Sequence, residues 1–309
     1  MLYHIIKDMK KGPTSPKGFR DIEPETAKKR RQAIGQIADV LESFGFVPLE
    51  TPTIEFAETL TGKYGEEEKL IYKFEDKGGR SLALRYDLTV PLARYVANNL
   101  GVLSPTFCRY QIGQVFRGEN PQKGRYREFT QFDFDSVGVA DPKEDAKVIA
   151  AAISAARKLG LGEAVMAIND RANFEGLPPE VVRTIDKIGK IGKEEAKKEL
   201  SQKGFAEKEL EIIDNMETSE PTESLVTIFS ILEGEYALIR GKDFVFDPTL
   251  ARGLDYYTGA IFELKPTGAS GELSLGGGGR YDKLIAIFAG RPIPAVGFSF
   301  GIDRLIEFL

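Results

Sequence analysis

The residues with the clearest chemical potential are the arginines and lysines between positions 109 and 131. This stretch carries five positive and two negative side chains, a net +3, whereas the whole chain of 309 residues has a formal charge of −5. Pro121 and Gly124 favour a tight loop there. Arginine presents a planar fork of donors that matches phosphate oxygens. The segment is therefore either a phosphate-binding hairpin or a solvated hairpin tip with surface ion pairs. Its charged members are Arg109, Arg117, Glu119, Lys123, Arg125, Arg127 and Glu128.

A second group joins an arginine to paired tyrosines in the run RGLDYY, residues 252–257. Asp255 is placed to orient Arg252, and the pair Tyr256 and Tyr257 is expected to open a strand. Because successive strand residues face opposite ways, both rings are not expected in the core. Packing of the aromatic rings across a β-hairpin is the alternative.

A third group is a glycine run, residues 276–279, followed by Arg280, Tyr281 and Asp282. Four glycines contribute no side-chain packing and cost conformational entropy. The run therefore indicates either close approach of the backbone to a ligand or a flexible turn.

Two shorter segments complete the set. Residues 295–305 read as a strand of small residues leading into an apolar helix, with Arg304 near the helix start, where it could reach an anion. Asp87 and Thr89 precede or begin a helical segment, so they either cap it or bind an amine.

Composition narrows the chemistry. The chain has one cysteine, Cys108, and one histidine, His4, which excludes an intrachain disulfide, a zinc site of the usual kind, and a Ser-His-Asp mechanism unless His4 serves. Neither a G-x-x-x-x-G-K-[ST] loop nor a G-x-G-x-x-G motif after a strand occurs. The chemistry must come from carboxylates, arginine, lysine, tyrosine and backbone groups.

The overall make-up is that of a globular protein, with 42% hydrophobic and 29% charged residues. Because the pI is about 5.3, any contact with nucleic acid must use a local basic patch. No apolar run approaches ~18 residues, and the N-terminus lacks a signal peptide. We expect a cytoplasmic protein with no membrane partner.

Hydrophobic periodicity predicts the elements that must position these residues. Mostly hairpin connections, with helices inserted unevenly, indicate an α+β fold with a largely antiparallel sheet. Residues 183–211 form a small, highly charged helical unit between two β-rich parts. Prolines between residues 46 and 55 favour an edge strand or an extended segment. Helices are expected at 23–44, 89–99 and 142–159, and strands at 71–75, 80–86, 107–116, 127–138 and 163–168.

Taken in order, the motifs resemble class II aminoacyl-tRNA synthetases, and closely the histidyl-tRNA synthetase family, over about residues 16–309. Residues 16–21 with 46–55 resemble the family's N-terminus and motif 1, a dimer-interface element. Residues 116–131 resemble motif 2, and residues 295–305 resemble motif 3. The runs RGLDYY and GGGRYD resemble two signatures specific to the histidine enzymes.

The resemblance implies a catalytic fold with a mostly antiparallel six-stranded sheet flanked by helices. The expected organisation is an N-terminal arm at 1–15, a catalytic domain at 16–170 and 226–309, and a helical insertion at 171–225, without an anticodon-binding domain. It also implies a ligase, histidine–tRNA ligase, that uses ATP and Mg²⁺ to form histidyl-adenylate from L-histidine. Transfer to the acceptor end of tRNA(His) follows, in a homodimer assembled through motif 1.

Site roles also follow from the resemblance. Arg117 matches the arginine that holds the α-phosphate, and Arg252 matches the one that bridges the substrate carboxylate and the α-phosphate; these two are the expected catalytic residues. The other expected ATP-binding residues are Glu119 and Phe129 for adenine, Arg125 for phosphate and Arg304 near the γ-phosphate. The expected histidine-binding residues are Asp87, Thr89 and Gln131 around the α-amino group, with Leu88 in the same segment. Asp135, Tyr257 and Tyr281 are expected around the imidazole, with Tyr256 adjacent, and the backbone of Gly277 and Gly279 is expected in the wall of the pocket.

The chain departs from the family by ending just inside the motif 3 helix, where those enzymes continue into an anticodon-binding domain. A cut-out catalytic part, a natural stand-alone paralogue and an engineered core all fit this, and weak tRNA charging with persisting adenylation is expected. The rival function is the catalytically silent regulatory subunit of ATP phosphoribosyltransferase, which shares the fold. A pseudo-synthetase that senses uncharged tRNA is a third reading.

Overall fold

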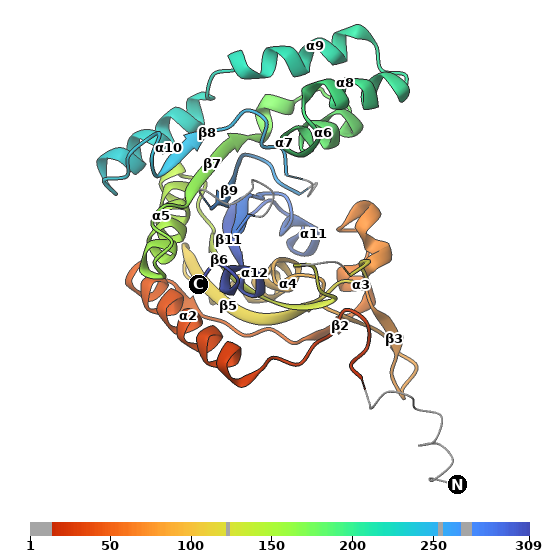
Figure 1. The fold of residues 1–309 in the computed structure, drawn as a ribbon. Helices are drawn as coiled ribbons and strands as arrows, with labels where there is room; N and C mark the ends of the chain where they lie inside the picture. The colour runs from red at the N-terminus through yellow and green to blue at the C-terminus, as the bar shows by residue number, and fades with distance from the viewer. Residues whose placement is uncertain (1–13, 122–123, 253–255, 267–273) are drawn as a thin grey trace.

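The computed structural model describes residues 14–121, 124–252, 256–266 and 274–309. Their main feature is one large sheet with the strand order β1-β5-β6-β11-β10-β9-β7-β8 (Figure 1). The six inner strands are antiparallel throughout, which confirms the predicted sheet. Two short strands, β1 and β8, add parallel edges to it. The bounds are β1 Val47–Pro48, β5 Phe107–Phe116, β6 Glu128–Val137, β7 Val165–Asp170, β8 Phe244–Phe246, β9 Ala260–Lys265, β10 Gly276–Arg280 and β11 Ala295–Gly301.

The longest pairing is the hairpin of β5 with β6, which holds ten residue pairs from Phe107↔Val137 to Phe116↔Glu128. Along β6 the side chains alternate. Phe132 and Phe134 belong to the core beneath the helices, whereas Gln131, Asp133 and Asp135 face a cavity on the other side. The two faces of this strand thus separate packing from chemistry.

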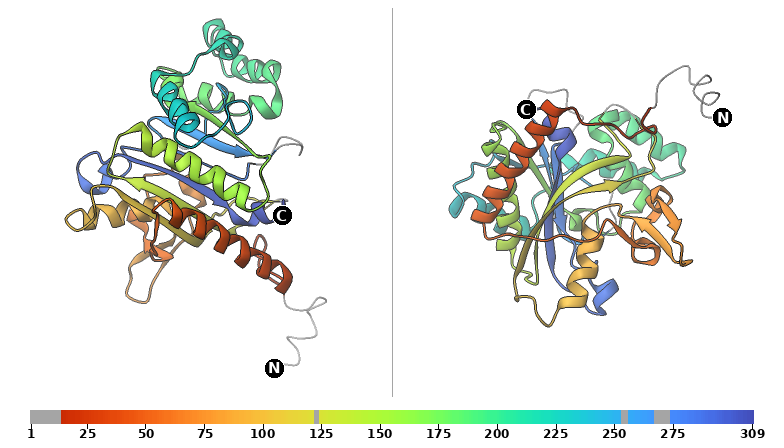
Figure 2. Two further views of the ribbon diagram at one scale, coloured as in Figure 1. Left: turned by 90° about the vertical axis from the view of Figure 1, so that its left-hand side faces the viewer. Right: turned by 90° about the horizontal axis from the view of Figure 1, so that it is seen from below.

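Four helices cover the core face of the sheet: α2 Pro24–Ser43, α5 Pro142–Lys158, α10 Glu223–Gly234 and α12 Ile302–Ile306. Helix α5 begins at the residue after Asp141, whose carboxylate accepts the backbone N–H of Lys143 at 2.9 Å. Its alanines are buried and let neighbouring helices approach closely. Figure 2 shows α5 lying along the sheet beside α2.

A second, three-stranded sheet has the order β2-β4-β3, with β2 Ile54–Phe56, β3 Lys73–Glu75 and β4 Ser81–Leu84. The β3–β4 turn is held by Asp76, whose carboxylate accepts the backbone N–H groups of Gly78 and Arg80. The short helices α3 Ala57–Leu60 and η1 Gly65–Leu70 follow β2, and α4 Thr89–Asn99 has the bounds predicted from the sequence.

The charged segment after β7 is helical, as its periodicity predicts. It comprises η2 Arg171–Phe174, α6 Pro179–Ile185, α7 Ile188–Ile191, α8 Lys193–Gln202, α9 Glu207–Asn215 and η3 Met216–Thr218. These helices lie together at the top of Figure 1, away from α2. Ala196, Leu200 and Ile213 are their buried apolar contacts.

Two expectations about local structure are wrong. The glycine run is not a turn, because Gly276 to Gly279 lie within β10, paired with β11 and β9. Tyr256 and Tyr257 do not open a strand, because β9 begins only at Ala260. Outside a strand, the two rings need not face opposite ways.

Some expectations lie outside the described residues: the arm at 1–13 with His4, and Leu254 and Asp255 of the RGLDYY run. A search of the described residues found no helix of the length and apolarity that crossing a membrane requires. A further short helix, α11 Ala286–Ala289, precedes β11.

Candidate active site

A cavity of about 430 Å³ lies against the central strands on the face opposite α2 and α5. It brings together nearly all the residues predicted from the sequence, although they come from segments far apart in the chain. The predicted residues that line it are Asp87, Thr89, Arg117, Glu119, Arg125, Phe129, Gln131, Asp135, Arg252, Tyr256, Tyr257, Gly277, Tyr281 and Arg304.

Leu88 and Gly279 do not line the cavity but support its wall. Leu88 is fully buried, and its carbonyl accepts Nη2 of Arg109 at 3.4 Å. A Cβ on Gly279 would lie 2.8 Å from the ring of Tyr257, so this glycine makes room for the tyrosine.

At one end of the cavity, Arg117 lies between two aromatic rings. Its guanidinium carbon is 4.3 Å from the ring centroid of Tyr86 and 5.1 Å from that of Phe129. Its Nε donates to the carbonyl of Tyr86 at 3.2 Å. Stacking and this bond fix the plane of the guanidinium, which is what in-plane recognition of a phosphate requires.

Two more arginines, Arg125 and Arg304, occupy the same end. Arg304 donates from Nη1 to the carbonyl of Ser274 at 2.9 Å. Burial and the charge of Arg125 lower the pKa of Arg304, so the two cations repel each other in a partly desolvated place. Arg125 lies 3.7 Å from Glu119. An anion with several negative oxygens would relieve this repulsion.

Arg252 enters the cavity from the segment before β9 and has an unusual backbone. Its φ is +46°, in the left-handed region that a residue with a Cβ rarely adopts. The backbone N–H donates to Asp186 at 3.0 Å, and the guanidinium lies 3.7 Å from Glu263. A Cβ on Gly277 would come within 1.7 Å of Nη1 of Arg252. The glycine strand therefore makes room for this arginine rather than for a ligand alone.

At the other end, Asp135 is held between Tyr281 and Arg109. The hydroxyl of Tyr281 donates to Oδ1 of Asp135, and Nη2 of the fully buried Arg109 lies 2.7 Å from Oδ2. Burial raises the pKa of Asp135 despite the opposing charge of Arg109. A Cβ on Gly297 would come within 1.8 Å of Oδ1, so this glycine makes the carboxylate's position possible.

An aromatic wall adjoins this carboxylate. The rings of Tyr256 and Tyr257 have centroids 4.9 Å apart, and Tyr256 meets Tyr281 edge to face at 6.0 Å. Burial raises the pKa of each phenol, so all three stay neutral hydrogen-bonding groups at physiological pH.

Asp87 lies between the two ends and has a clear structural role. Its Oδ1 accepts the backbone N–H groups of Thr89 and Val90 at 3.2 and 3.0 Å, and the hydroxyl of Tyr64 at 3.0 Å. It therefore holds the start of α4, as the capping interpretation predicts, and it also lines the cavity.

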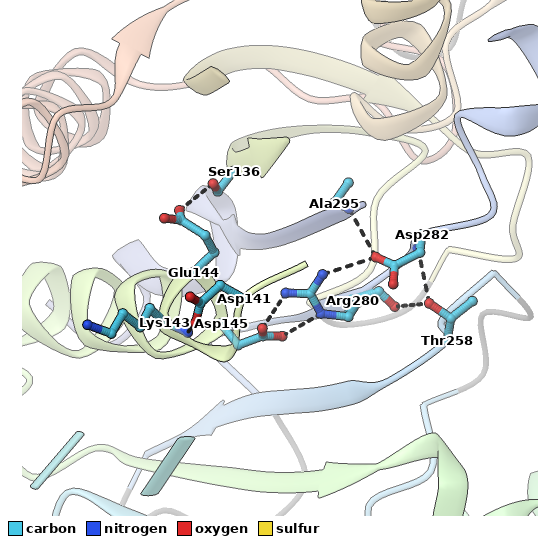
Figure 3. Close-up of polar contacts among 9 residues, drawn as sticks. All are labelled: Ser136, Asp141, Lys143, Glu144, Asp145, Thr258, Arg280, Asp282 and Ala295. Carbon is cyan, nitrogen blue, oxygen red and sulfur yellow. Dashed lines mark hydrogen bonds and ion pairs between the residues drawn. The ribbon is translucent and has the colours of Figure 1, made fainter. Parts of the chain in front are cut away.

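An ion-pair network behind the cavity fixes the end of β10 (Figure 3). Both oxygens of Asp145, on α5, accept from Arg280, whose Nη1 also donates to Asp282 at 3.1 Å. The backbone N–H of Thr258 donates to the carbonyl of Arg280 at 2.8 Å. Tyr281 lies between Arg280 and Asp282, so this network anchors the tyrosine that contacts Asp135.

Sequence reasoning missed several chemically active lining residues: Glu67, Tyr86, Asp133, Asp186, Ser299 and Asp303. Alternation along β6 could have found Asp133, because it lies two residues from both Gln131 and Asp135. Asp303 could have been suspected beside Arg304; it pairs with Arg20 and with Arg30, the latter at 2.5 Å. Glu67 and Asp186 come from other segments, and no local pattern marks them.

Among the described residues, no group of three or more histidine, cysteine, aspartate and glutamate side chains is placed to hold a metal ion.

The antiparallel sheet, with an arginine-rich end and an aspartate–tyrosine end in one cavity, defines the catalytic fold of class II aminoacyl-tRNA synthetases. A solved histidyl-tRNA synthetase from a Nostoc species matches with a TM-score of 0.82 and 30% identity, over 97% of this chain and 76% of that one. A model of the family described as histidyl-tRNA synthetase matches residues 18–203 and 194–305. The chain belongs to the histidyl-tRNA synthetase family.

A curated relative, the histidine–tRNA ligase of Aeropyrum pernix, is 43% identical over 96% of this chain and 74% of its own length. A Bacillus halodurans structure named as an ATP phosphoribosyltransferase regulatory subunit/histidyl-tRNA synthetase is 27% identical, with a TM-score of 0.79 over 95% of this chain and 82% of that one. The enzyme class these comparisons support is histidine–tRNA ligase, an ATP-using family.

Proposed function

We propose that this chain joins L-histidine to ATP, forming histidyl-adenylate and pyrophosphate, and then transfers the histidyl group to the 3′ end of tRNA(His). One observation carries the proposal. Arg117 and Arg252 line one cavity together with Arg125 and Arg304 and with the hydrogen-bonded pair of Asp135 and Tyr281. The arginines gather at one end of this cavity and the Asp135–Tyr281 pair lies at the other. The cavity thus offers one place for a polyphosphate and another for an imidazole.

In the activation step, a carboxylate oxygen of histidine attacks the α-phosphorus of ATP, and the bond to the bridging oxygen of pyrophosphate breaks. Negative charge on the α-phosphoryl oxygens is redistributed in the transition state. Arg117 and Arg252 supply fixed positive charge at these oxygens, held in place by stacking and by the room that Gly277 leaves. Preorganised donors of this kind lower the barrier without reorganisation.

Binding of ATP uses the remaining residues of that end. Phe129 provides a ring on which adenine stacks, and Glu119 provides acceptors for the adenine amino group. Arg125 and Arg304 bind the outer phosphates. The two guanidinium groups repel each other, and the negative charge of the phosphates offsets this repulsion.

Selection of histidine falls to Asp135, Tyr281 and the tyrosine pair. Asp135 is buried and already oriented by Tyr281 and Arg109. An amino acid lacking ring nitrogens would leave these polar groups unpaired, which is costly in a buried site. The ligand therefore has to bring the imidazole, since no histidine side chain lines the cavity in the described part of the chain.

Mg²⁺ belongs to this proposal as a companion of ATP. The described residues offer no cluster that would hold the ion by themselves. Magnesium commonly keeps several waters and binds substrate phosphates with one or two carboxylates. Mg²⁺ would therefore be held mainly by the phosphates of ATP, whose negative charge it would offset.

We also propose a homodimer formed through the motif 1 region. On one face of the small sheet, Phe56 and Phe74 each pair with Leu82 and form an apolar row across three strands. Phe56 is 50% exposed, Phe74 41% and Ile54 44%. Neighbouring apolar side chains of this size on a surface typically mark a contact with another protein.

The helices within residues 171–225 are proposed as an inserted unit that borders the site, with 16–170 and 226–309 as the catalytic domain. Asp186 supports this because it accepts the backbone N–H of Arg252 at 3.0 Å. We propose that the acceptor end of tRNA(His) binds at the cavity. The proposed location is the cytoplasm, where ATP and tRNA are available.

The deciding experiment is histidine-dependent exchange of pyrophosphate into ATP. We expect exchange with L-histidine and none with phenylalanine, which lacks ring nitrogens. The rival regulatory function is favoured by the name of the Bacillus halodurans structure. Activation of an ATP phosphoribosyltransferase without any exchange would establish the rival and refute the ligase.

A further inference from the structure

Asp133 is a buried acidic residue of the cavity lining that the proposed mechanism does not use. It lies in the middle of β6, is 3% exposed, and lines the cavity between Gln131 and Asp135. Because Gln131, Asp133 and Asp135 are alternate residues of one strand, their side chains share a face. An aspartate at the centre of a substrate cavity is costly to bury unless something pairs with it.

The hydrogen bonds around Asp133 are incomplete. Its Oδ1 is buried and has no hydrogen-bond partner among the described residues, and the same holds for Oε1 of Gln131. Ser299, on the neighbouring strand β11, is paired directly with Asp133. It accepts Nε2 of Gln131 at 3.1 Å and hydrogen-bonds to Asp133. Two residues with unpartnered buried acceptors thus line the same cavity, and both hydrogen-bond to Ser299, which also lines it.

The neighbouring charges are already committed elsewhere. Arg109, on β5, is paired with Asp135 at 2.7 Å. Arg85, after β4, donates to the carbonyls of Gln114 and Thr51 at 2.7 and 2.9 Å. Within the described residues, Asp133 has no cationic nitrogen within 4 Å, which is the ion-pair distance.

We propose that Asp133 binds the α-ammonium group of the amino-acid substrate, together with Gln131. This inference rests on the proposed function and adds a residue to it. An ammonium carries three N–H donors and one positive charge, so it satisfies the orphaned acceptors of both side chains and the uncompensated carboxylate at once. Asp135 differs in that its charge is already paired with Arg109 at 2.7 Å, so it is left for the ring of the substrate.

Proton linkage supports the same assignment. Burial raises the pKa of Asp133 to about 7, and Asp135 and Asp87 add to the rise while Arg109 opposes it. An arriving ammonium favours the ionised carboxylate, so binding near pH 7 releases part of a proton from the protein. The negative charge of Asp133 also acts on the phenols of Tyr256 and Tyr257, whose pKa values are raised, mainly by burial, so both stay protonated.

The test separates the ammonium from the rest of the ligand. Binding of L-histidine, histidinol (no carboxylate) and imidazole-lactate (hydroxyl in place of the amine) is measured by calorimetry with the wild type and Asp133→Asn. We expect Asp133→Asn to weaken histidine and histidinol by about tenfold or more, the size of a lost charge-assisted hydrogen bond. Imidazole-lactate should change by less than about twofold. Equal weakening of all three ligands, or of none, overturns the proposal.

Asp243→Asn is the matched control, because Asp243 is also buried but pairs with Arg157 outside the cavity. It should bind all three ligands as the wild type does. A wild type that binds no histidine would refute the proposed function itself, whereas normal histidine binding by Asp133→Asn refutes only the role of Asp133.

A measurement on the wild type alone keeps the proposal testable if the variant does not fold. Calorimetry at pH 7 in buffers of different ionisation enthalpy gives the protons released. We expect histidine to release about half a proton more than imidazole-lactate does, because Asp133 is about half protonated at its pKa. Equal release by the two ligands would contradict the proposal.

Discussion

The two ends of the cavity handle their charges differently. Asp135 is placed before any ligand arrives, because Oδ1 accepts a hydrogen bond from Tyr281 and Oδ2 forms an ion pair with Arg109. Arg304 and Arg125 instead lie near each other as like charges, and Arg304 donates a hydrogen bond to the carbonyl of Ser274. The protein thus organises one end in advance, whereas at the other end the proposed phosphates of ATP would compensate the like charges.

The difference matches what each end does in the proposed function. Selecting one amino acid requires donors and acceptors at fixed positions, because discrimination comes from groups left unpaired by the wrong ligand. Binding a polyphosphate requires mainly positive charge, which tolerates some motion. Arg252 and Asp133 belong to neither group, since each is a single charged side chain for which the proposed function has a specific substrate group. Substitutions at these two positions therefore test the contrast most directly.

The largest expected effect is at Arg252. Replacing it by alanine removes the cation proposed to contact both the substrate carboxylate and the α-phosphate, so exchange should fall by ~10²-fold or more. Steady-state exchange measures this. Arg291→Ala, an exposed arginine, is the control and should leave exchange within about twofold. A loss below about threefold would remove Arg252 from the catalytic step.

Tyr281→Phe tests the preorganised end alone. The variant deletes one hydrogen bond to Asp135 and keeps the ring, so kcat/KM for histidine should fall by ~10-fold or more. The KM for ATP should stay within about twofold. A comparable rise in both KM values would show that the two ends are not independent.

Glu119→Gln tests the end completed by its ligand. Losing the carboxylate that is proposed to bind adenine, and that lies 3.7 Å from Arg125, should raise the KM for ATP by about fivefold. Histidine binding, followed by calorimetry without ATP, should not change. Equal effects on both substrates would undercut the assignment to adenine.

The smallest effect concerns stability. Burial raises the pKa of Asp133 from its ordinary 3.8 to about 7. The folded state therefore holds this proton more tightly, and its contribution to stability is lost as pH rises from about 4 to 7. Asp133→Asn avoids that loss, so its melting temperature should exceed that of the wild type by about 3 °C or more at pH 8. The gap should shrink as pH falls towards 5. A variant that is less stable at pH 8 would show that the charge is compensated after all.

Part of the fold is predictable because two of its strands, β5 and β6, are ten residues long and alternate polar and apolar side chains over much of their length. The ranges for β5 and β6 and the bounds of α4 follow from alternation and helical periodicity. The glycine strand is not predictable in this way, since Gly276 to Gly279 have no side chains to show a period. Their role is visible only when Arg252 and Tyr257 are seen in the space that a Cβ would fill.

The site also contains residues that the sequence predicts and residues that it does not. Arg117, Arg252 and Asp135 lie in motifs that carry the family resemblance, so their presence in one cavity is foreseeable. Glu67 and Asp186 reach the cavity through tertiary packing of other segments, which a pattern along the chain does not encode.

The ion pair of Arg280 with Asp145 has a consequence for register. A strand of four consecutive glycines looks the same after a slip of one or two residues, so its own side chains cannot specify which residues it pairs with. The buried Leu275 and the anchored Arg280 flank the run and differ from it. They define where β10 stops along β9 and β11, and with it the alignment of Tyr281 against Asp135. Helix α5, through Asp145, thus fixes the pairing register of a strand whose glycines alone would not specify one.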